Sequence, residues 1–175
     1  MNDFYAEYLV EKRSDGKDTA KRILLLVGMT VLCIVIFLFT GPVGILLSAL
    51  VVYGGYYLFT GTSTEYEYII TNGSFDVDKI SGRRSRKRLI STEISTFTDF
   101  GKLADAPAAP SGCTTVLASD NSGGEDWYAD LKHKSAGNVR IIFSPNEKII
   151  EGVEMFLPRQ LKLELRRQGK LSLKK

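Results

Sequence analysis

The sequence predicts an α+β protein: an N-terminal transmembrane helical hairpin followed by a small β-barrel or sandwich of about seven strands with a C-terminal capping helix. Two observations support this class. Residues 23–59 contain no charged side chain. From residue 65 onward, apolar and polar side chains alternate, as they do in strands with one buried face. The rest of the 175-residue chain is large enough for one small domain with its own core.

The apolar run divides into two short helices. About twenty apolar residues cross a hydrocarbon core roughly 30 Å thick, so these thirty-seven residues are long enough to cross nearly twice. Near the middle, Thr40-Gly41-Pro42 is a turn signal, because glycine relaxes the backbone and proline lacks a donor. We therefore expect a membrane hairpin over 23–60, with helices at about 23–39 and 43–59. The run starts too late and is too long for a cleavable signal peptide.

The charges beside this run predict its orientation. Five cations precede the first helix and five more lie within Arg83–Arg88, whereas the loop between the helices has none. Short flanks rich in Lys and Arg stay in the cytoplasm. We therefore expect a multi-pass protein of the cell membrane with both termini cytoplasmic. Cys33 and Cys113 could not meet in a bridge in this arrangement, which fits a reducing compartment.

Residues 1–22 form the expected cytoplasmic head. Within Asn2–Val10, the apolar residues Phe4, Tyr5, Tyr8 and Leu9 recur at helical spacing. This pattern is typical of a short helix lying at the membrane interface. Packing of the same segment against the soluble domain explains it equally well, so both interpretations stay open.

The soluble domain is expected over 62–158. Asn72-Gly73 between two alternating runs is a strong signal for a hairpin turn, because both turn positions need a positive φ. The seven expected strands are Glu65–Thr71, Ser74–Ile80, Arg86–Ile90, Ser95–Phe100, Cys113–Ser119, Trp127–His133 and Val139–Phe143.

One amphipathic helix should follow the strands. Ser144 is the expected cap and Pro145 the first helical residue. Pro158 should end or kink the helix, and residues 159–175 form a basic tail that is either a second helix or a loose end. The apolar face of the expected helix consists of Ile149, Ile150, Val153, Phe156 and Leu157.

The segments YEYIITNGSFDVDKISGRRSRKRLISTEISTFTDF and NVRIIFSPNEKIIEGVEMFL carry this order of strands, basic turn and final helix. In this order the chain resembles a bacterial pleckstrin-homology-like (PH-like) domain that follows a membrane hairpin. Its layout is also similar to an uncharacterised family of small Gram-positive membrane proteins. The resemblance implies a bent barrel plugged by the helix and specifies no activity. The long 101–112 loop departs from the pattern, so another seven-strand α+β topology remains an alternative.

The densest charge in the chain is a basic turn of five cations. Anionic lipid attracts each such cation by about 1 kcal/mol near a membrane surface. The turn is therefore the candidate lipid- or partner-binding site. Alternatively, the charges only orient the hairpin and solubilise a loop. Nucleic acid is disfavoured, because no aromatic stacking platform accompanies the turn. The five cations are Arg83, Arg84, Arg86, Lys87 and Arg88.

No motif indicates catalysis. His133, the only histidine, lies between two lysines with no serine motif nearby, so we interpret it as a solvated strand residue. The segment Asp120–Asp126 resembles a calcium loop but lacks its sixth-position glycine and distal glutamate, which favours a hairpin turn. Zinc spacings and phosphate-binding glycine motifs are absent. We expect no catalytic residue, no metal and no cofactor.

These observations predict a non-enzymatic membrane protein that holds a PH-like module at the inner leaflet. The module would bind a protein partner or anionic lipid through the basic turn and the C-terminal Arg and Lys residues. The alternative is a structural subunit of a larger membrane complex. An enzyme with an unrecognised site is the third possibility. The oligomeric state stays open.

Overall fold

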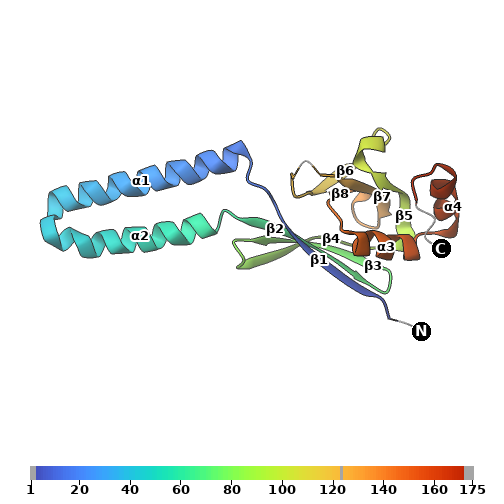
Figure 1. Ribbon diagram of the computed structural model, residues 1–175, viewed down its shortest axis with the longest axis horizontal. Helices are drawn as coiled ribbons and strands as arrows, with labels where there is room; N and C mark the ends of the chain where they lie inside the picture. The colour runs from blue at the N-terminus through green and yellow to red at the C-terminus, as the bar shows by residue number, and fades with distance from the viewer. Residues whose placement is uncertain (1–2, 123, 172–175) are drawn as a thin grey trace.

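The computed structural model describes residues 3–122 and 124–171. Asn2 of the expected head, Gly123 of the calcium-like segment, and Lys174 and Lys175 of the basic tail lie outside the described residues. The elements, shown in Figure 1, are β1 (Tyr5–Glu11), α1 (Gly16–Thr40), η1 (Gly41–Val43), α2 (Gly44–Thr60), β2 (Thr64–Thr71), β3 (Ser74–Ser81), β4 (Ser85–Glu93), η2 (Ile94–Thr96), β5 (Phe97–Lys102), η3 (Leu103–Asp105), β6 (Thr114–Ala118), β7 (Trp127–His133), β8 (Gly137–Phe143), α3 (Glu147–Phe156) and α4 (Arg159–Arg167).

The strands form two four-stranded sheets. Sheet A has the order β1-β2-β3-β4, and sheet B has the order β5-β7-β8-β6. Neighbouring strands are antiparallel, except that β6 lies parallel to β8. The seven expected strands correspond to β2 through β8, so the expected count is too low by one within the described chain. The predicted turn is present: Asn72 and Gly73 have φ values of 49° and 95°.

The missed strand is β1, and of the two interpretations of the N-terminal segment the interfacial helix is wrong. β1 pairs antiparallel with β2, from Tyr5 opposite Thr71 to Glu11 opposite Glu65. Along β1, Ala6 and Val10 are buried. Tyr5 and the other alternate positions face outward. The segment therefore packs on the soluble domain, as the second interpretation proposed, because a strand partner sixty residues later overrides the helical spacing.

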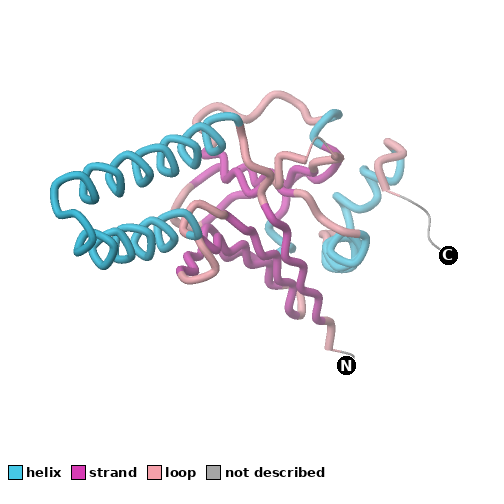
Figure 2. Tube along the Cα trace, turned by 60° about the vertical axis from the view of Figure 1, so that its left-hand side comes forward, coloured by secondary structure: helices cyan, strands magenta, loops and turns pink. Residues whose placement is uncertain are grey.

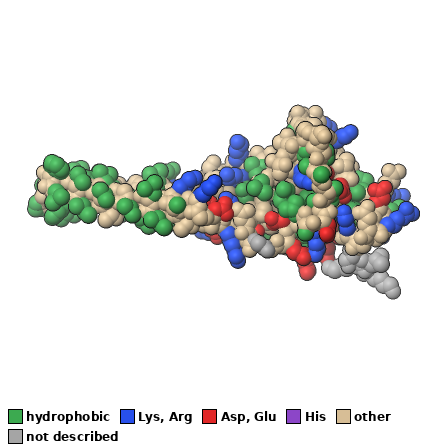
Figure 3. Space-filling view, turned by 90° about the horizontal axis from the view of Figure 1, so that it is seen from above, with side chains coloured by type: hydrophobic (Ala, Val, Ile, Leu, Met, Phe, Trp, Pro, Cys, Tyr) green, Lys and Arg blue, Asp and Glu red, His purple; other side chains and the backbone are tan. Residues whose placement is uncertain are grey.

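Helices α1 and α2 run antiparallel and extend away from the sheets as a helical hairpin (Figures 1 and 2). The two helices approach closely at Gly55, where an added Cβ would meet the side chain of Met29, and at Gly44, where it would meet the side chain of Thr40. Helix α1 contains no buried residue and begins at Gly16, earlier than expected. Hydrophobic side chains accordingly cover the surface of the hairpin in Figure 3.

The core lies between the two sheets and is closed by α3. Aromatic rings of both sheets meet there: the ring centroids of Phe75 and Phe143 are 5.4 Å apart. Ile149 and Val153 of α3 are fully buried against this core. Gly152 makes the close approach possible, because a Cβ at this position would meet the Phe4 ring at 2.6 Å.

The expected cap of α3 is wrong by two residues. Asn146 caps the helix, because its Oδ1 accepts a hydrogen bond of 2.9 Å from the Ile149 N–H. The Ser144 hydroxyl instead donates to Asp126 Oδ1 at 2.6 Å. After Pro158 the expected tail continues as α4, which buries Leu161 and Leu165. The helical alternative for this segment is therefore the correct one over Arg159–Arg167.

Candidate functional site

The predicted basic turn lies at the point where the helical hairpin joins sheet A. Gly82, in the β3–β4 turn, has φ of 59° and donates its N–H to the Ser63 carbonyl at 2.8 Å. Ser63 connects α2 to β2. The turn that carries the cations is therefore fixed against the end of the hairpin, and we call this region the junction.

Arg84 ties the turn to α2. Its Nη2 donates to Thr60 Oγ1 at 2.8 Å, and its Nη1 donates to the Tyr57 carbonyl at 3.2 Å. The guanidinium also lies 4.0 Å from the centre of the Tyr57 ring. The C-terminal end of a helix carries partial negative charge, so a cation is favoured here. Arg84 is thus a structural link as well as a surface cation.

Arg86 and Arg88 are paired with carboxylates of the two preceding strands. Nε of Arg86 and Nε of Arg88 donate to the two oxygens of Asp78, at 2.7 Å and 2.8 Å. Arg86 also pairs with Glu67, and Arg88 lies 3.0 Å from Asp76 Oδ2. Asp78 is only 2% exposed. The hydrogen bond that Arg88 donates to Asp78 raises the pKa of the Arg88 guanidinium, which therefore stays charged.

Arg83 is held by Glu65. Its Nε donates to Glu65 Oε1 at 2.9 Å, and this hydrogen bond raises the pKa of the Arg83 guanidinium. The side chain remains largely exposed. Among the five predicted cations, Lys87 alone has no hydrogen bond or ion pair to the described residues.

The structure thus brings the five predicted residues together but neutralises most of them. The sequence contained the signal: carboxylates alternate along the two strands that precede the basic turn, on the face that receives its arginines. Contact of the turn with lipid or a partner stays a prediction, and the free charge available for it is smaller than the sequence suggests. The four carboxylates are Glu65, Glu67, Asp76 and Asp78.

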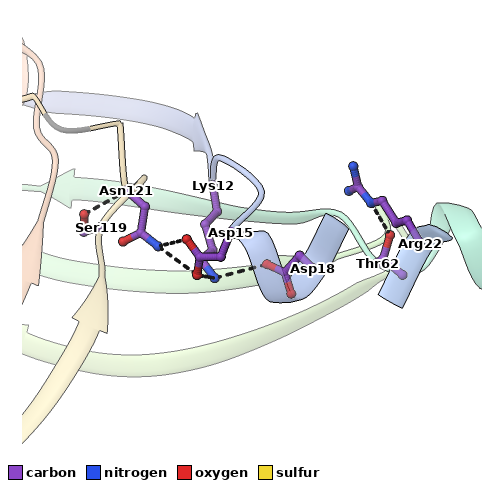
Figure 4. Close-up of polar contacts among 7 residues, drawn as sticks. All are labelled: Lys12, Asp15, Asp18, Arg22, Thr62, Ser119 and Asn121. Atoms are coloured by element: carbon purple, nitrogen blue, oxygen red, sulfur yellow. Dashed lines mark hydrogen bonds and ion pairs between the residues drawn. The ribbon is translucent and has the colours of Figure 1, made fainter. Parts of the chain in front are cut away.

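The linker between β1 and α1 is fixed to the other sheet (Figure 4). Asp15 accepts from Asn121 Nδ2 at 3.1 Å and pairs with Lys12 Nζ at 3.2 Å. The Arg13 N–H donates to the Asp120 carbonyl at 2.7 Å. Hydrogen bonding to Asp15 raises the pKa of the Lys12 ammonium. The contacts of Asp15 with Asn121 and of Arg13 with Asp120 connect segments remote in sequence, and no local pattern predicts them.

Arg22 closes the open end of the helical hairpin. Its Nε donates to Thr62 Oγ1 at 2.9 Å, as Figure 4 shows, and its guanidinium carbon lies 5.6 Å from the centre of the Phe59 ring. Beside Arg22 lies a pocket of about 230 Å³, which we call the junction pocket. It is lined by Glu11, Arg22, Phe59, Thr60, Ser63, Gly82 and Arg83.

The calcium-like segment contains no metal site within the described residues. Asp120 and Asp126 accept hydrogen bonds from the Ser144 hydroxyl, at 3.1 Å and 2.6 Å, so they support the chain rather than an ion. The expectation of a hairpin turn here is wrong. Because β6 pairs with β8 and not with β7, the segment crosses from one edge of sheet B to its interior.

His133 is engaged by its own turn. Its Nε2 lies 3.3 Å from the Ser91 carbonyl, and its Nδ1 lies 3.1 Å from Ser135 Oγ and 3.4 Å from the Ser135 amide nitrogen. A pocket of about 280 Å³ adjoins the ring, with Lys132 and Lys134 in its lining. The histidine is half-buried rather than fully solvated. Ser135 lies two residues after His133 in the β7–β8 turn, and no carboxylate in the described chain orients the ring.

Two packed sheets closed by a C-terminal helix, with a helical hairpin inserted at the junction, define a PH-like domain with an added apolar element. A family model described as "Bacterial PH-like domain (DUF6106)" matches residues 2–163, and the chain belongs to this family. The predicted PH-like resemblance is confirmed. The match extends through β1, the hairpin and both sheets. No curated protein and no solved structure matches the chain.

The helical segment Gly16–Thr60 is long and apolar enough to cross a membrane, and none of its most apolar stretch is buried. This statement about membrane crossing rests on the length and composition of the segment. The chain is therefore a PH-like domain of unknown function with an apolar helical segment near its N-terminus.

Proposed function

We propose that the protein crosses the cell membrane twice and holds a non-catalytic PH-like module against the cytoplasmic surface, where the module binds a protein partner or anionic lipid. The observation that carries this proposal is the place of the hairpin in the fold. It interrupts sheet A between two strands, β1 and β2, that pair directly with each other.

Pairing of β1 with β2 favours an even number of crossings. The register runs from Tyr5 opposite Thr71 to Glu11 opposite Glu65. A single crossing would put the two strands on opposite sides of the bilayer and prevent this pairing. Helices of 25 and 17 residues are about 37 Å and 25 Å long, against a hydrocarbon core of roughly 30 Å. Two crossings keep β1 and β2 on the same side of the bilayer, and each helix has about the length that one crossing needs.

The exposure of the hairpin supports a lipid environment. Phe39 and Leu38, near the tip, are 86% and 75% exposed, and Leu46 on the other helix is 74% exposed. Soluble monomers rarely expose contiguous apolar patches larger than a few hundred Å². Hydrocarbon satisfies these side chains without any further protein partner.

The charges support a cytoplasmic module. Lysine and arginine side chains gather where the hairpin meets the domain (Figure 3), whereas the η1 turn at the far end has none. Cytoplasmic flanks carry such an excess of Lys and Arg. Arg22 and Arg84, which contact the last turn of α2, would then lie at the level of the lipid head groups.

The two ends of the domain would have different partners. Helix α4 lies at the end of the molecule opposite the hairpin (Figure 1). Its cations, Arg166 and Arg167 among them, would face the cytosol and so favour a protein partner over the bilayer. In this proposal the C-terminal Arg and Lys residues would contact the protein partner, and the basic turn would contact lipid.

A cysteine-labelling experiment tests the topology. In a variant with Cys33→Ser and Cys113→Ser, single cysteines are introduced by Val43→Cys in η1 or Lys134→Cys in the β7–β8 turn. An impermeant maleimide should label Val43→Cys in intact cells and Lys134→Cys only after permeabilisation. Carbonate extraction should leave the protein in the membrane. Labelling of Lys134→Cys in intact cells, or release by carbonate, would refute the proposal.

A further inference from the structure

We propose that the junction pocket binds the phosphate of an anionic glycerophospholipid from the cytoplasmic leaflet. This inference rests on the proposed membrane insertion and names a ligand for it. The pocket lies where the helical hairpin enters the domain, between the end of α2, the β3–β4 turn and the end of β1. In an inserted protein this is the depth of the lipid head groups.

Two arginines from separate elements line the pocket, and each has unused donors. Arg22 uses Nε for Thr62 Oγ1, and Arg83 uses Nε for Glu65 Oε1. The terminal nitrogens of both side chains have no hydrogen bond to the described residues. A guanidinium held by Nε presents its outer nitrogens in a fixed fork, which matches two oxygens of a phosphate.

A third guanidinium lies beside the pocket. Arg84 is bound to Thr60, which is itself a lining residue. The carboxylate in the lining, Glu11, offsets part of this positive charge. A phosphodiester carries one negative charge, so the pocket suits it better than a multiply charged phosphate monoester.

The remaining polar groups are acceptors. The Thr60 hydroxyl donates to the Tyr56 carbonyl at 3.0 Å, and the Ser63 hydroxyl donates to the Thr60 carbonyl at 3.2 Å. Thr60 Oγ1 already accepts from Arg84, so the Ser63 hydroxyl oxygen and the Glu11 carboxylate are left to accept hydrogen bonds. This combination favours a head group with hydroxyl donors next to the phosphodiester, such as glycerol. The exposed apolar surface of the hairpin begins beside the pocket and would contact the acyl chains.

The arrangement differs from diffuse attraction to anionic lipid. Arg86 and Arg88 belong to the same basic turn and strand, but their donors are taken by Asp78 and its neighbours. Only Arg83 of the predicted cluster lines the pocket. The second arginine of the pocket, Arg22, precedes the apolar run in sequence. Only the folded structure shows that it lies near Arg83.

The test uses full-length protein purified in a neutral detergent and titrated with phosphatidylglycerol, with bound lipid counted by native mass spectrometry. Arg22→Gln and Arg83→Gln should each weaken binding about tenfold. Ser63→Leu should weaken it too, because the added side chain fills the pocket while both arginines remain. Lys17→Gln and Lys21→Gln are matched controls that remove a neighbouring cation outside the pocket, and they should bind like the wild type.

Equal losses in the controls would overturn the pocket in favour of diffuse electrostatics. Competition by micromolar glycerophosphoglycerol, which has no acyl chains, would identify a soluble phosphate ligand and overturn the lipid assignment. Thermal unfolding in lipid-free detergent checks that each variant is folded. Arg22→Lys keeps the positive charge but not the forked donors, so its lipid affinity should lie between those of the wild type and Arg22→Gln. A wild-type protein that resists carbonate but binds no phosphatidylglycerol would refute the pocket alone.

Discussion

Gly82 lies directly against Gly61: a Cβ built on Gly82 would be 2.8 Å from the Gly61 Cα and 3.1 Å from the Thr60 carbonyl oxygen. Gly82 also has φ of 59°, a conformation that side chains with a Cβ rarely adopt. The β3–β4 turn therefore meets the end of α2 backbone to backbone. This contact sets the angle between the helical hairpin and sheet A.

Gly82→Ala should strongly destabilise the protein, because the methyl group adds a backbone clash to the strain of a positive φ. The strain alone costs about 1–3 kcal/mol. Gly112→Ala is the matched control, since Gly112 has φ of 70° and open space around its Cβ position. The melting temperature of full-length protein in detergent should fall further for Gly82→Ala. Equal decreases would show that the contact with α2 contributes nothing.

Removal of the hairpin should leave a folded, soluble domain. The Lys12 N–H donates to the Thr64 carbonyl at 2.9 Å, so these residues face each other at the end of the β1–β2 ladder. Replacement of residues 13–63 by Asn-Gly would join them through a two-residue turn. A dispersed amide NMR spectrum and cooperative unfolding are expected.

A fragment that starts at residue 62 provides the comparison for this excision. It lacks β1, so the inward side chains Ala6 and Val10 no longer cover the core. This fragment should bind hydrophobic dyes and unfold without cooperativity. A fragment as stable as the excised domain would show that β1 is dispensable.

The buried ion pair of sheet B should be far more important for stability than an exposed one. Arg140 donates through Nε and Nη2 to both oxygens of Asp130, at 2.7 Å and 2.6 Å, and each side chain is 8% exposed. Asp130→Asn or Arg140→Met should cost about 3–5 kcal/mol, because one buried charge is left unpaired. Chemical unfolding of the hairpin-excised domain measures this cost.

The exposed pair between Lys102 and Glu125 is the control on the same sheet. These side chains are 45% and 69% exposed, so Lys102→Ala should cost no more than about 1 kcal/mol. The double change Asp130→Asn with Arg140→Met should lose less than the sum of the single changes, since neither variant residue is charged. If the loss of stability in the double variant equals the sum of the two single losses, the two side chains are not energetically coupled.

Stability should decline in alkaline solution. Burial raises the pKa of the Tyr68 hydroxyl well above its ordinary value of 10.0, and the hydroxyl donates to the Ala118 carbonyl. The unfolded chain loses this proton above about pH 10, whereas the folded chain keeps it. The contribution is therefore complete below pH 10 and is lost as the pH rises above it.

Tyr68→Phe should lower stability at neutral pH by about 1 kcal/mol, because the Ser144 N–H also loses its 3.2 Å acceptor. The alkaline decline of this variant should be shallower than that of the wild type. Burial raises the pKa of Tyr128 as well, so some decline should remain. Unfolding curves measured from pH 8 to above pH 10 test the difference, and parallel curves would contradict it.

Local patterns predicted the elements of this fold and failed where distant segments decide the structure. Asn72-Gly73 specifies its own turn, and the seven predicted strands are present. β1 was missed because its apolar residues also fit a helical period, and only its pairing with β2 distinguishes the two. Ser144 and Asn146 are both good helix caps in sequence. Asn146 is the cap because Asp126 engages the Ser144 hydroxyl.

In the candidate site too, the residues could be predicted from local sequence, but their contacts with distant segments could not. The five cations of the basic turn are evident in sequence, and so are the carboxylates at alternate positions of the preceding strands. Their pairing requires the register that places Asp78 opposite Arg88. The meeting of Arg22 with Arg83 requires the fold of the whole junction, because the apolar run separates them.

If the hairpin inserts as proposed, its place between partner strands would couple biogenesis to quality control. The ribosome releases β1 before the apolar run and β2 only after it, so the first strand would wait, unpaired, at the translocon. Sheet A would close once both helices had entered the bilayer and β2 had emerged on the same side. A chain whose insertion fails would keep its aromatic interior exposed, and cellular proteases would recognise that defect before any misplaced copy accumulates.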